Sequence, residues 1–187
     1  LAGLEVSGRV EYFRVIAAEL ERAASHLGSI ARTLRLLGIQ LTAARLEEEA
    51  EGVRQLLAAT GNRIYDTFSV LGGLMRAPQV SSEFLSAAEK LRKNIYESVN
   101  QLLDNRQLEH RTVGVGMIDP AAALEWGLTG PVARASELAL DTRRTDPYAA
   151  YLDIEVRLVT QRRGDLYARL AVRGLDALES LNIVNTA

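Results

Sequence analysis

The sequence predicts a mainly α-helical protein: a bundle of about four long helices with an irregular insertion rich in glycine and proline and a small β element. Three observations support this prediction. Apolar residues recur at helical spacing over most of the chain, glycine and proline concentrate in one internal segment, and one short stretch alternates apolar with charged residues. A chain of 187 residues suits a single domain, which we expect to span residues 1–187.

The first long helix is expected to run from about Val10 to Leu37. Its apolar residues are spaced alternately by three and four positions, as one face of an α-helix requires. They are Val10, Phe13, Ala17, Leu20, Ala24, Leu27, Ala31 and Leu34. Gly38 follows at the position where a residue with positive φ would end the helix.

Three further long helices are expected from similar apolar spacing. Thr42 is a candidate N-cap for the second, Ser81 or Ser82 for the third, and the last runs from about Asp165 to Leu181. Their apolar faces comprise Leu46, Ala50, Val53, Leu57, Ile64, Phe68 and Leu71; then Phe84, Ala88, Leu91, Ile95, Val99 and Leu102; and finally Leu166, Leu170, Ala177 and Leu181.

The irregular insertion opens with "RTVGVGMIDPAAALEWGLTGPVARAS", residues 111–136. Asp119 and Pro120 form an N-cap and first-turn pair, and Gly127 supplies a stop, so the residues between them are expected to form a short helix. A Thr-Gly-Pro sequence at residues 129–131 then turns the chain again.

One stretch after this insertion has the pattern of a strand. Its apolar residues Ile154, Val156 and Leu158 alternate with the charged residues Asp153, Glu155 and Arg157. Alternation with a period of two predicts a strand with one buried face, and this is the expected β element.

Composition excludes several classes of protein. Lys and Arg number 22 against 24 Asp and Glu, a net charge of −2, so no nucleic-acid partner is expected. The mean hydropathy is −0.01 and no apolar run approaches the ~18–20 residues of a membrane span, so no direct span is predicted. Because the chain contains no cysteine, disulfides and thiolate metal sites are excluded within it.

Three motifs suggest chemistry but have simpler interpretations. "GVGMID" begins like a dinucleotide fingerprint, but Asp119 stands at the third glycine position and no βαβ unit surrounds it. A carboxylate-bridged metal core needs Glu-x-x-His pairs, which neither His26 nor His110 provides, so no metal site is predicted. The run "EEEAE", Glu47 to Glu51, is interpreted as a solvated helix face.

Two features are candidates for function. His26 lies in mid-helix beside the apolar stripe, as a core histidine does, with a role in proton handling as the alternative. The loop "DTRRTDPY" alternates Asp141, Arg143, Arg144 and Asp146 just before Pro147 and Tyr148. Such a cluster either pins the loop through charge-assisted hydrogen bonds or presents charge to a partner protein, and the residues alone leave both open.

The segment at residues 111–136, followed by "DTRRTDPYAAY" and "GDLYARLAVR", resembles the D-type, quinone-reducing subunit of NADH–quinone oxidoreductase, respiratory complex I. That subunit belongs to the superfamily of nickel–iron hydrogenase large subunits. The first helix, "VEYFRVIAAELERAASHLGSIARTLRLLG", is similar to the family's "ELxRxxSHLxxLG" helix, and "TGNRIY" with paired glycines follows in the same order. The similarity covers nearly the whole chain.

The resemblance implies that residues 1–187 are the central helical part of such a protein, with its N- and C-terminal parts outside them. In the family, the quinone headgroup meets a histidine and a tyrosine that would precede Leu1, and the cysteines that hold nickel in hydrogenases would also fall outside. No catalytic residue or metal ligand is therefore expected here, and the isolated chain should be inactive. The candidates for a partner interface or for proton handling are His26, Arg134, Arg143, Asp146 and Tyr148.

The chain departs from the family's pattern at three places. Leu36 stands where the family commonly has an aspartate that is thought to pair with the quinone-site histidine, and leucine cannot ionise. Tyr65 and Asp66 stand in place of a histidine pair, and Val70 in place of an arginine. These departures favour a divergent member that has kept the family's scaffold.

The function implied by the resemblance is that of a core subunit of a respiratory NADH–quinone oxidoreductase, forming the quinone-reduction module with an iron–sulfur partner subunit. Quinone, NAD and iron–sulfur clusters are implied for the complex, with no cofactor on the chain itself. The chain would then lie peripherally, on the cytoplasmic side of the inner membrane, among the other subunits of a membrane-bound complex. The alternatives are the large subunit of a membrane-associated nickel–iron hydrogenase or related complex, and a non-catalytic relative that acts as an assembly scaffold.

Overall fold

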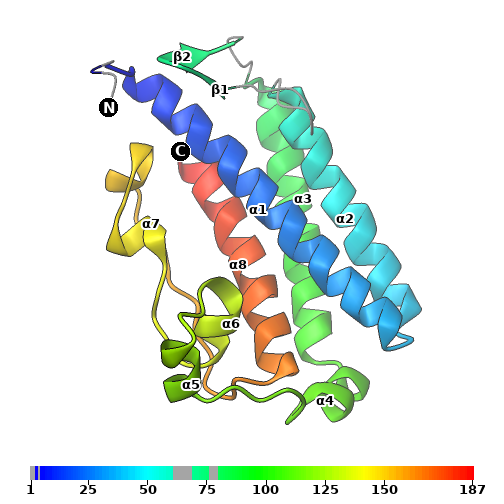
Figure 1. Ribbon diagram of the computed structural model, residues 1–187. Helices are drawn as coiled ribbons and strands as arrows, with labels where there is room; N and C mark the ends of the chain where they lie inside the picture. The colour runs from blue at the N-terminus through cyan, green and yellow to red at the C-terminus, as the bar shows by residue number, and fades with distance from the viewer. Residues whose placement is uncertain (1–2, 4, 61–68, 76–79) are drawn as a thin grey trace.

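The computed structural model describes residues 3, 5–60, 69–75 and 80–187. Within that part four long helices form a bundle, namely α1 (Gly8–Leu36), α2 (Gln40–Ala59), α3 (Ser82–Leu103) and α8 (Leu166–Thr186). α1 packs against α2 and α8, and α3 packs against the same two helices, so the four surround a common core (Figure 1). The prediction of a mainly α-helical bundle is confirmed.

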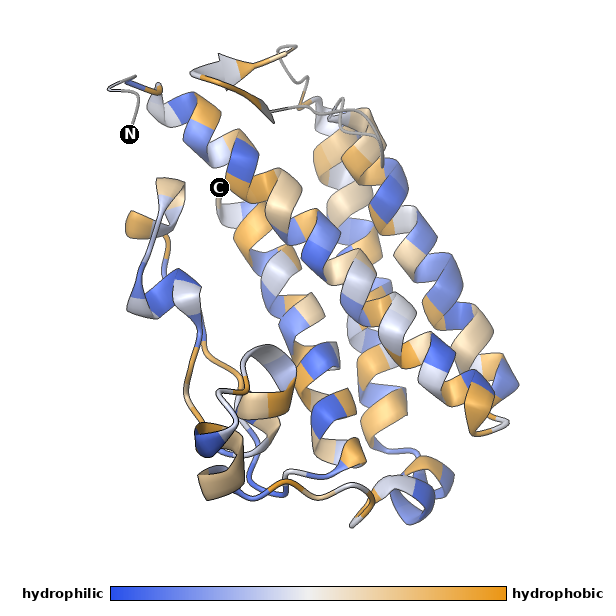
Figure 2. Ribbon diagram, viewed as in Figure 1, coloured by the Kyte–Doolittle hydropathy of each residue, from blue (hydrophilic) through white to orange (hydrophobic). Residues whose placement is uncertain are grey.

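The core of the bundle is the apolar stripe predicted on the first helix and its counterparts. Leu20, Leu27 and Leu34 are 0% exposed, and each contributes about 1.5–3 kcal/mol through burial. Each long helix carries both hydrophobic and hydrophilic residues (Figure 2), as amphipathic helices around one core do. Gly38 ends α1 as predicted, because its φ of +75° lets the Ile39 amide donate to the Leu34 carbonyl at 2.9 Å.

The helix starts follow the predicted caps with one exception. The Ser81 hydroxyl accepts from the amide of Phe84 at 3.2 Å, so the cap predicted for α3 is confirmed. The prediction of Thr42 as the N-cap of α2 is wrong, since the helix starts at Gln40, after Ile39. Ile39 makes no side-chain cap bond but is only 7% exposed, so its burial in the core fixes this start where a polar cap was expected.

The connection between α3 and α8 runs along the side of the bundle (Figure 1). Its short elements are α4 (Arg106–Thr112), α5 (Pro120–Glu125), α6 (Gly130–Ala135), α7 (Thr142–Thr145) and the 3₁₀ helix η1 (Ala149–Leu152). Asp119 accepts from the Ala122 amide at 2.9 Å and Gly127 has a φ of +62°, so the predicted short helix α5 is confirmed. α4, α6, α7 and η1 were not predicted as helices, because elements this short carry no readable periodicity, and residues 129–131 were expected only to turn the chain.

Gly164, which precedes α8, is hydrogen-bonded to two earlier segments of this connection. Its amide donates to the Ala135 carbonyl at 2.8 Å, and its carbonyl accepts from the Ile118 amide at 3.0 Å. The Ser136 hydroxyl donates to the Ile118 carbonyl at 2.9 Å, so three segments meet around this glycine. The next residue, Asp165, caps α8 by accepting from the amide of Ala168 at 2.8 Å.

The strand predicted at residues 153–158 is not formed. Burial alternates there as predicted, with Ile154 and Val156 buried and Glu155 exposed, but no described strand pairs with the segment. Alternation of apolar and charged residues predicts which face of a segment is buried. It does not show whether another strand pairs with that segment. The strands within the described residues are instead β1 (Ser69–Val70) and β2 (Gly73–Leu74), an antiparallel pair. The predicted face residues Ile64 and Phe68 lie outside the described part.

The interpretation of Glu47 to Glu51 as a wholly solvated face is wrong for Glu49. This side chain lies between α2 and α3 and is 6% exposed, whereas Glu48 is exposed. The Ser98 hydroxyl donates to it at 2.5 Å, and Arg45 approaches to 3.6 Å. Burial outweighs these interactions and raises the pKa of Glu49 from 4.5 to about 7.

Glu49→Gln is therefore expected to stabilise the protein above neutral pH. The folded state binds a proton at Glu49 more tightly than the unfolded state, so Glu49 lowers stability as pH rises from 4.5 through about 7. Glutamine keeps an acceptor for Ser98 without the charge and should raise the free energy of unfolding at pH 8 by roughly 2–3 kcal/mol, with little effect near pH 4. Urea unfolding at both pH values measures this difference. Glu48→Gln is the control, and an equal effect of both variants at pH 8 would refute the assignment.

Candidate functional site

A network of buried charged side chains connects α1 and α8 to the connection between α3 and α8. Its first half is centred on Arg143 of α7, which is 1% exposed. The guanidinium donates to both carboxylate oxygens of Glu19 on α1, at 3.0 and 3.2 Å. It also donates to both oxygens of Asp141, at 3.0 and 2.7 Å. One side chain therefore bridges α1 and its own loop with charge-assisted hydrogen bonds.

The second half of the network is centred on Arg134 of α6, which is 2% exposed. Arg134 forms a bidentate pair with Asp176 of α8, with one N–O distance of 2.7 Å. It also lies 3.3 Å from Asp141, which links the two halves. Burial alone would raise the pKa of Asp176, but His26 and Arg134 outweigh it and hold that pKa below its ordinary value. Asp176 is therefore ionised at neutral pH and anchors this half of the network.

His26 of α1 touches this network from within the bundle. Its Nε2 lies 3.5 Å from Asp176, and its Nδ1 lies 3.2 Å from the guanidinium of Arg173. Burial lowers the pKa of His26 below 6.5, although Asp176 opposes that shift. A neutral imidazole beside a carboxylate and an arginine agrees with the interpretation of His26 as a core histidine. Its alternative role in proton handling stays a prediction.

Tyr151 of η1 also belongs to the network, through its contact with Glu19. Its hydroxyl donates to the Glu19 carboxylate, and burial together with that carboxylate raises the pKa of Tyr151. Glu19 is 0% exposed and also lies 3.4 Å from Arg22, which is partly exposed at the rim. Glu19 thus meets three donors from three segments, and a buried carboxylate needs such partners.

This arrangement is suited to holding the connection in place. The buried arginines come from α6 and α7, whereas two of their carboxylate partners come from α1 and α8. A hollow of about 260 Å³ reaches Arg143 and Tyr151 from outside. Among the side chains that the structure describes, no group of three His, Asp or Glu is arranged to hold a metal ion. Nor does any described helix have the length and apolar character needed to cross a bilayer.

Three of the five site residues predicted from the sequence lie together in this network. His26, Arg134 and Arg143 are buried in it, whereas Asp146 and Tyr148 are exposed. Tyr148 contributes an edge-to-face contact with the ring of Tyr151, at a centroid distance of 5.0 Å.

Sequence reasoning missed Glu19, Asp176 and Tyr151. A signal for Glu19 was present, because it precedes His26 by seven residues, which places both on one face of α1. Asp176 carried a similar signal on α8, where it directly precedes the predicted core residue Ala177. Nothing in the sequence around Tyr151 pairs it with Glu19, 132 residues away.

Comparison with known proteins decides the family. Residues 41–187 match the family described as the respiratory-chain NADH dehydrogenase 49 Kd subunit. The chain belongs to this family. The D-type subunit of the NADH-quinone oxidoreductase of Dehalococcoides mccartyi is 34% identical to it over 100% of this chain and 52% of its own length. A chloroplastic NAD(P)H-quinone oxidoreductase subunit of Draba nemorosa is 33% identical over 100% of this chain and 48% of its own length.

The chain is also similar to a hydrogenase. The carbon monoxide-induced hydrogenase of Rhodospirillum rubrum is 30% identical over 98% of this chain and 52% of its own length. This chain therefore spans about half the length of the curated relatives that it matches. The resemblance to the D-type subunit of complex I and to hydrogenase large subunits, drawn from the sequence, is confirmed.

Two of the positions that depart from the family pattern, Leu36 and Val70, are exposed on the surface of the described structure. Leu36 occupies the last turn of α1 and is 89% exposed, so it takes no part in the core. Val70 lies in β1 and is 37% exposed. Tyr65 and Asp66 lie outside the described residues. Neither Leu36 nor Val70 forms a hydrogen bond or an ion pair with the side chains of the buried network.

Proposed function

We propose that the chain is part of a core subunit of a respiratory NADH–quinone oxidoreductase, in which it forms the quinone-reduction module with an iron–sulfur partner subunit. The observation that carries this proposal is the family match over residues 41–187, together with relatives named as NADH-quinone oxidoreductase subunits that align with the whole chain. Iron–sulfur clusters and the NAD site would belong to other subunits.

The described residues support a scaffolding role for this chain in the proposed complex. Two hollows, between α2 and α3 and between α3 and α8, are lined mainly by Glu, Arg, Asn and Gln side chains. Such linings suit polar partners and do not fit an apolar quinone. As the family resemblance implies, we assign quinone contact to residues outside this chain, and regard residues 1–187 as the single central helical domain of a longer protein. That protein would lie peripherally, on the cytoplasmic side of the inner membrane.

The buried network gives the scaffold a specific task. It fixes the glycine- and proline-rich connection against α1 and α8, which holds the outward surface of that connection in one shape. An iron–sulfur subunit that docks there needs a rigid surface, because ordering a loop on binding costs free energy. Asp146 and Tyr148, both exposed on this connection, are the proposed partner-contacting residues, and His26 the proposed proton-handling residue.

Deleting the gene tests the proposed function. Membranes from the deletion strain should lose quinone-dependent NADH oxidation, and the intact gene should restore it. Unchanged oxidation in the deletion strain would contradict the proposal. Hydrogen evolution is measured in the same membranes, because its loss in the deletion strain would favour the hydrogenase alternative.

Two alternatives have observations in their favour. The 30% identity with the carbon monoxide-induced hydrogenase favours a hydrogenase large subunit, which predicts nickel in the purified full-length protein. Leu36 favours a non-catalytic assembly scaffold, because it cannot carry the charge that the family commonly has there. A scaffold predicts a complex that assembles with its iron–sulfur partner and shows no turnover.

A further inference from the structure

Glu49 lines a hollow that takes no part in the buried network. The hollow lies between α2 and α3 and has a volume of about 480 Å³, which suits a small molecule. Three carboxylates line it, those of Glu48, Glu49 and Glu51, against one guanidinium, that of Arg45. The charge of the lining therefore favours a cation.

One oxygen of the Glu49 carboxylate has no hydrogen-bond donor. The side chain is 6% exposed, and the Ser98 hydroxyl donates to its Oε1 at 2.5 Å. Arg45 comes only within 3.6 Å of the same oxygen and lies equally far from Glu97. Oε2 is buried and receives no hydrogen bond from any residue that the structure describes. Because a buried carboxylate oxygen without a donor is unfavourable, a donor from a ligand would stabilise it.

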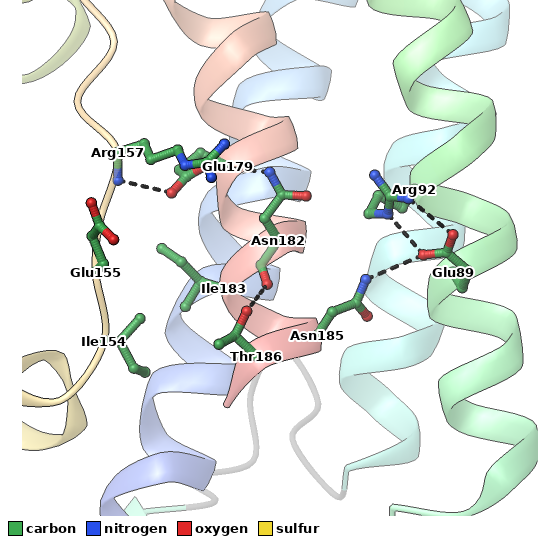
Figure 3. A pocket seen from close by; sticks show the side chains of 10 residues that line it. All are labelled: Glu89, Arg92, Ile154, Glu155, Arg157, Glu179, Asn182, Ile183, Asn185 and Thr186. Carbon is green, nitrogen blue, oxygen red and sulfur yellow. Dashed lines mark hydrogen bonds and ion pairs between the residues drawn. The ribbon is translucent and has the colours of Figure 1, made fainter.

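The hollow between α3 and α8 provides a contrast within the same molecule (Figure 3). There Arg92 donates to both oxygens of Glu89, at 2.8 and 2.9 Å. Glu179 accepts from a backbone amide at 2.8 Å on one oxygen and from Asn182 at 3.3 Å on the other. Both oxygens of these two carboxylates have donors, whereas Glu49 has a donor on one oxygen only. This difference points to the hollow beside Glu49 as the one that lacks a ligand group.

The surroundings of this oxygen narrow the class of cation. A metal ion needs several converging ligands, and no three of the described His, Asp or Glu side chains are arranged to hold one. A guanidinium pairs best with both oxygens of a carboxylate, but Ser98 already occupies Oε1. A primary ammonium needs one acceptor at a point, and the Asn94 amide in the same lining offers a second. Leu91, which would lie 3.1 Å from a Cβ at Gly52, adds an apolar wall for an alkyl chain.

We propose that the hollow between α2 and α3 binds a primary alkylammonium ion from solution, whose ammonium group donates to Oε2 of Glu49 and whose alkyl chain lies against Leu91. The site is separate from the buried network, and the inference does not depend on the proposed function. A lysine side chain carries the same ammonium group. A lysine that filled the hollow would exclude the free amine, so titration with an amine distinguishes these two sources.

Calorimetric titration of the purified full-length protein tests this proposal. The probe is n-butylammonium at pH 8, and the control is n-butyltrimethylammonium, which has the same charge and alkyl chain but no N–H group. We expect saturable binding of n-butylammonium at one site and binding of the control at least about tenfold weaker. Absence of saturable n-butylammonium binding would overturn the proposal. So would equal affinity for the two ions, which would reflect only a general attraction to the acidic lining.

A pair of variants locates the acceptor. Glu49→Gln keeps an acceptor for Ser98 but removes the charge, and it should weaken n-butylammonium binding at least about tenfold. Glu48→Gln removes the same charge from an exposed position in the same lining and should weaken binding only about twofold. Equal weakening by the two variants would refute the role of Glu49.

The affinity should also fall about tenfold between pH 8 and pH 6. Burial raises the pKa of Glu49 to about 7, so this side chain is mostly ionised at pH 8 and mostly protonated at pH 6. The amine stays protonated over this range, as a lysine side chain does. The groups that act on Glu49 are Arg45 and Glu48 from α2 and Ser98 from α3. An affinity that is the same at both pH values would contradict the proposal.

Discussion

Replacing Arg143 with alanine is expected to lower the free energy of unfolding by about 3–5 kcal/mol. The guanidinium is 1% exposed and pairs with Glu19, whose side chain is 0% exposed, and with Asp141, whose side chain is 7% exposed. Its removal leaves the Glu19 carboxylate inside the protein without its main counter-charge, and an uncompensated buried charge is costly. Urea unfolding at pH 7 measures the difference from the unaltered protein.

Arg144→Ala is the matched control for this prediction. Arg144 is the next residue on α7 and is exposed, so its loss should change the free energy of unfolding by no more than about 0.5 kcal/mol. The double variant Glu19→Gln with Arg143→Met should recover part of the loss, because it removes both buried charges and leaves groups of similar volume. Equal destabilisation by Arg143→Ala and Arg144→Ala would show that the network does not hold the connection.

Gly164→Ala is expected to lower the free energy of unfolding by about 2–5 kcal/mol. Gly164 has a φ of +62°, which costs an L-residue roughly 1–2 kcal/mol, and an added Cβ would overlap the carbonyl oxygen of Ile118. The Ser136 hydroxyl lies 3.1 Å from the same point, so the overlap has no room to relax and adds a further 1–3 kcal/mol. Thermal unfolding followed by circular dichroism would show the loss.

Gly127→Ala separates the two causes of this loss. Gly127 has the same φ of +62°, but a Cβ there would meet nothing within 4 Å. Its substitution should therefore lower the free energy of unfolding only by the cost of the positive φ, roughly 1–2 kcal/mol. If both glycine variants lose the same amount, the meeting of segments at Gly164 contributes nothing, and the path of the connection is set elsewhere.

The long helices could be predicted from the sequence because their signals are local. Spacing by three and four placed α1, Ser81 placed the start of α3, and Gly38 placed the end of α1. The start of α2 could not be predicted, because the burial of Ile39 depends on how α1 packs. Glu49 shows the same limit. Four carboxylates in five residues resemble a solvated face, and only the position of Ser98 on α3 shows that one of them is buried.

The candidate site could be predicted only in part, for a related reason. Arg143 was found in the loop at residues 141–148, where acidic and basic residues alternate, and Arg134 was found through the resemblance to the family. Their partners Glu19 and Asp176 lie 124 and 42 residues away, and pairing over such distances follows from the packing of the helices. The alternation at residues 153–158 correctly predicted which residues are buried but wrongly predicted a strand, since pairing needs a neighbouring strand and none of the described residues supplies one there.

The same network links the fold to the proposed function, since it holds the connection on which a partner protein would dock. Arg143 and Arg144 are adjacent on α7, yet one is 1% exposed and the other exposed. The most direct measurement is quinone-dependent NADH oxidation by membranes whose only copy of the subunit carries Arg143→Ala or Arg144→Ala, normalised to the amount of the complex. We predict that Arg143→Ala lowers both assembly and oxidation at least tenfold, while Arg144→Ala keeps most of both. Full assembly and full oxidation with Arg143→Ala would contradict the proposal that this buried network supports the quinone-reduction module.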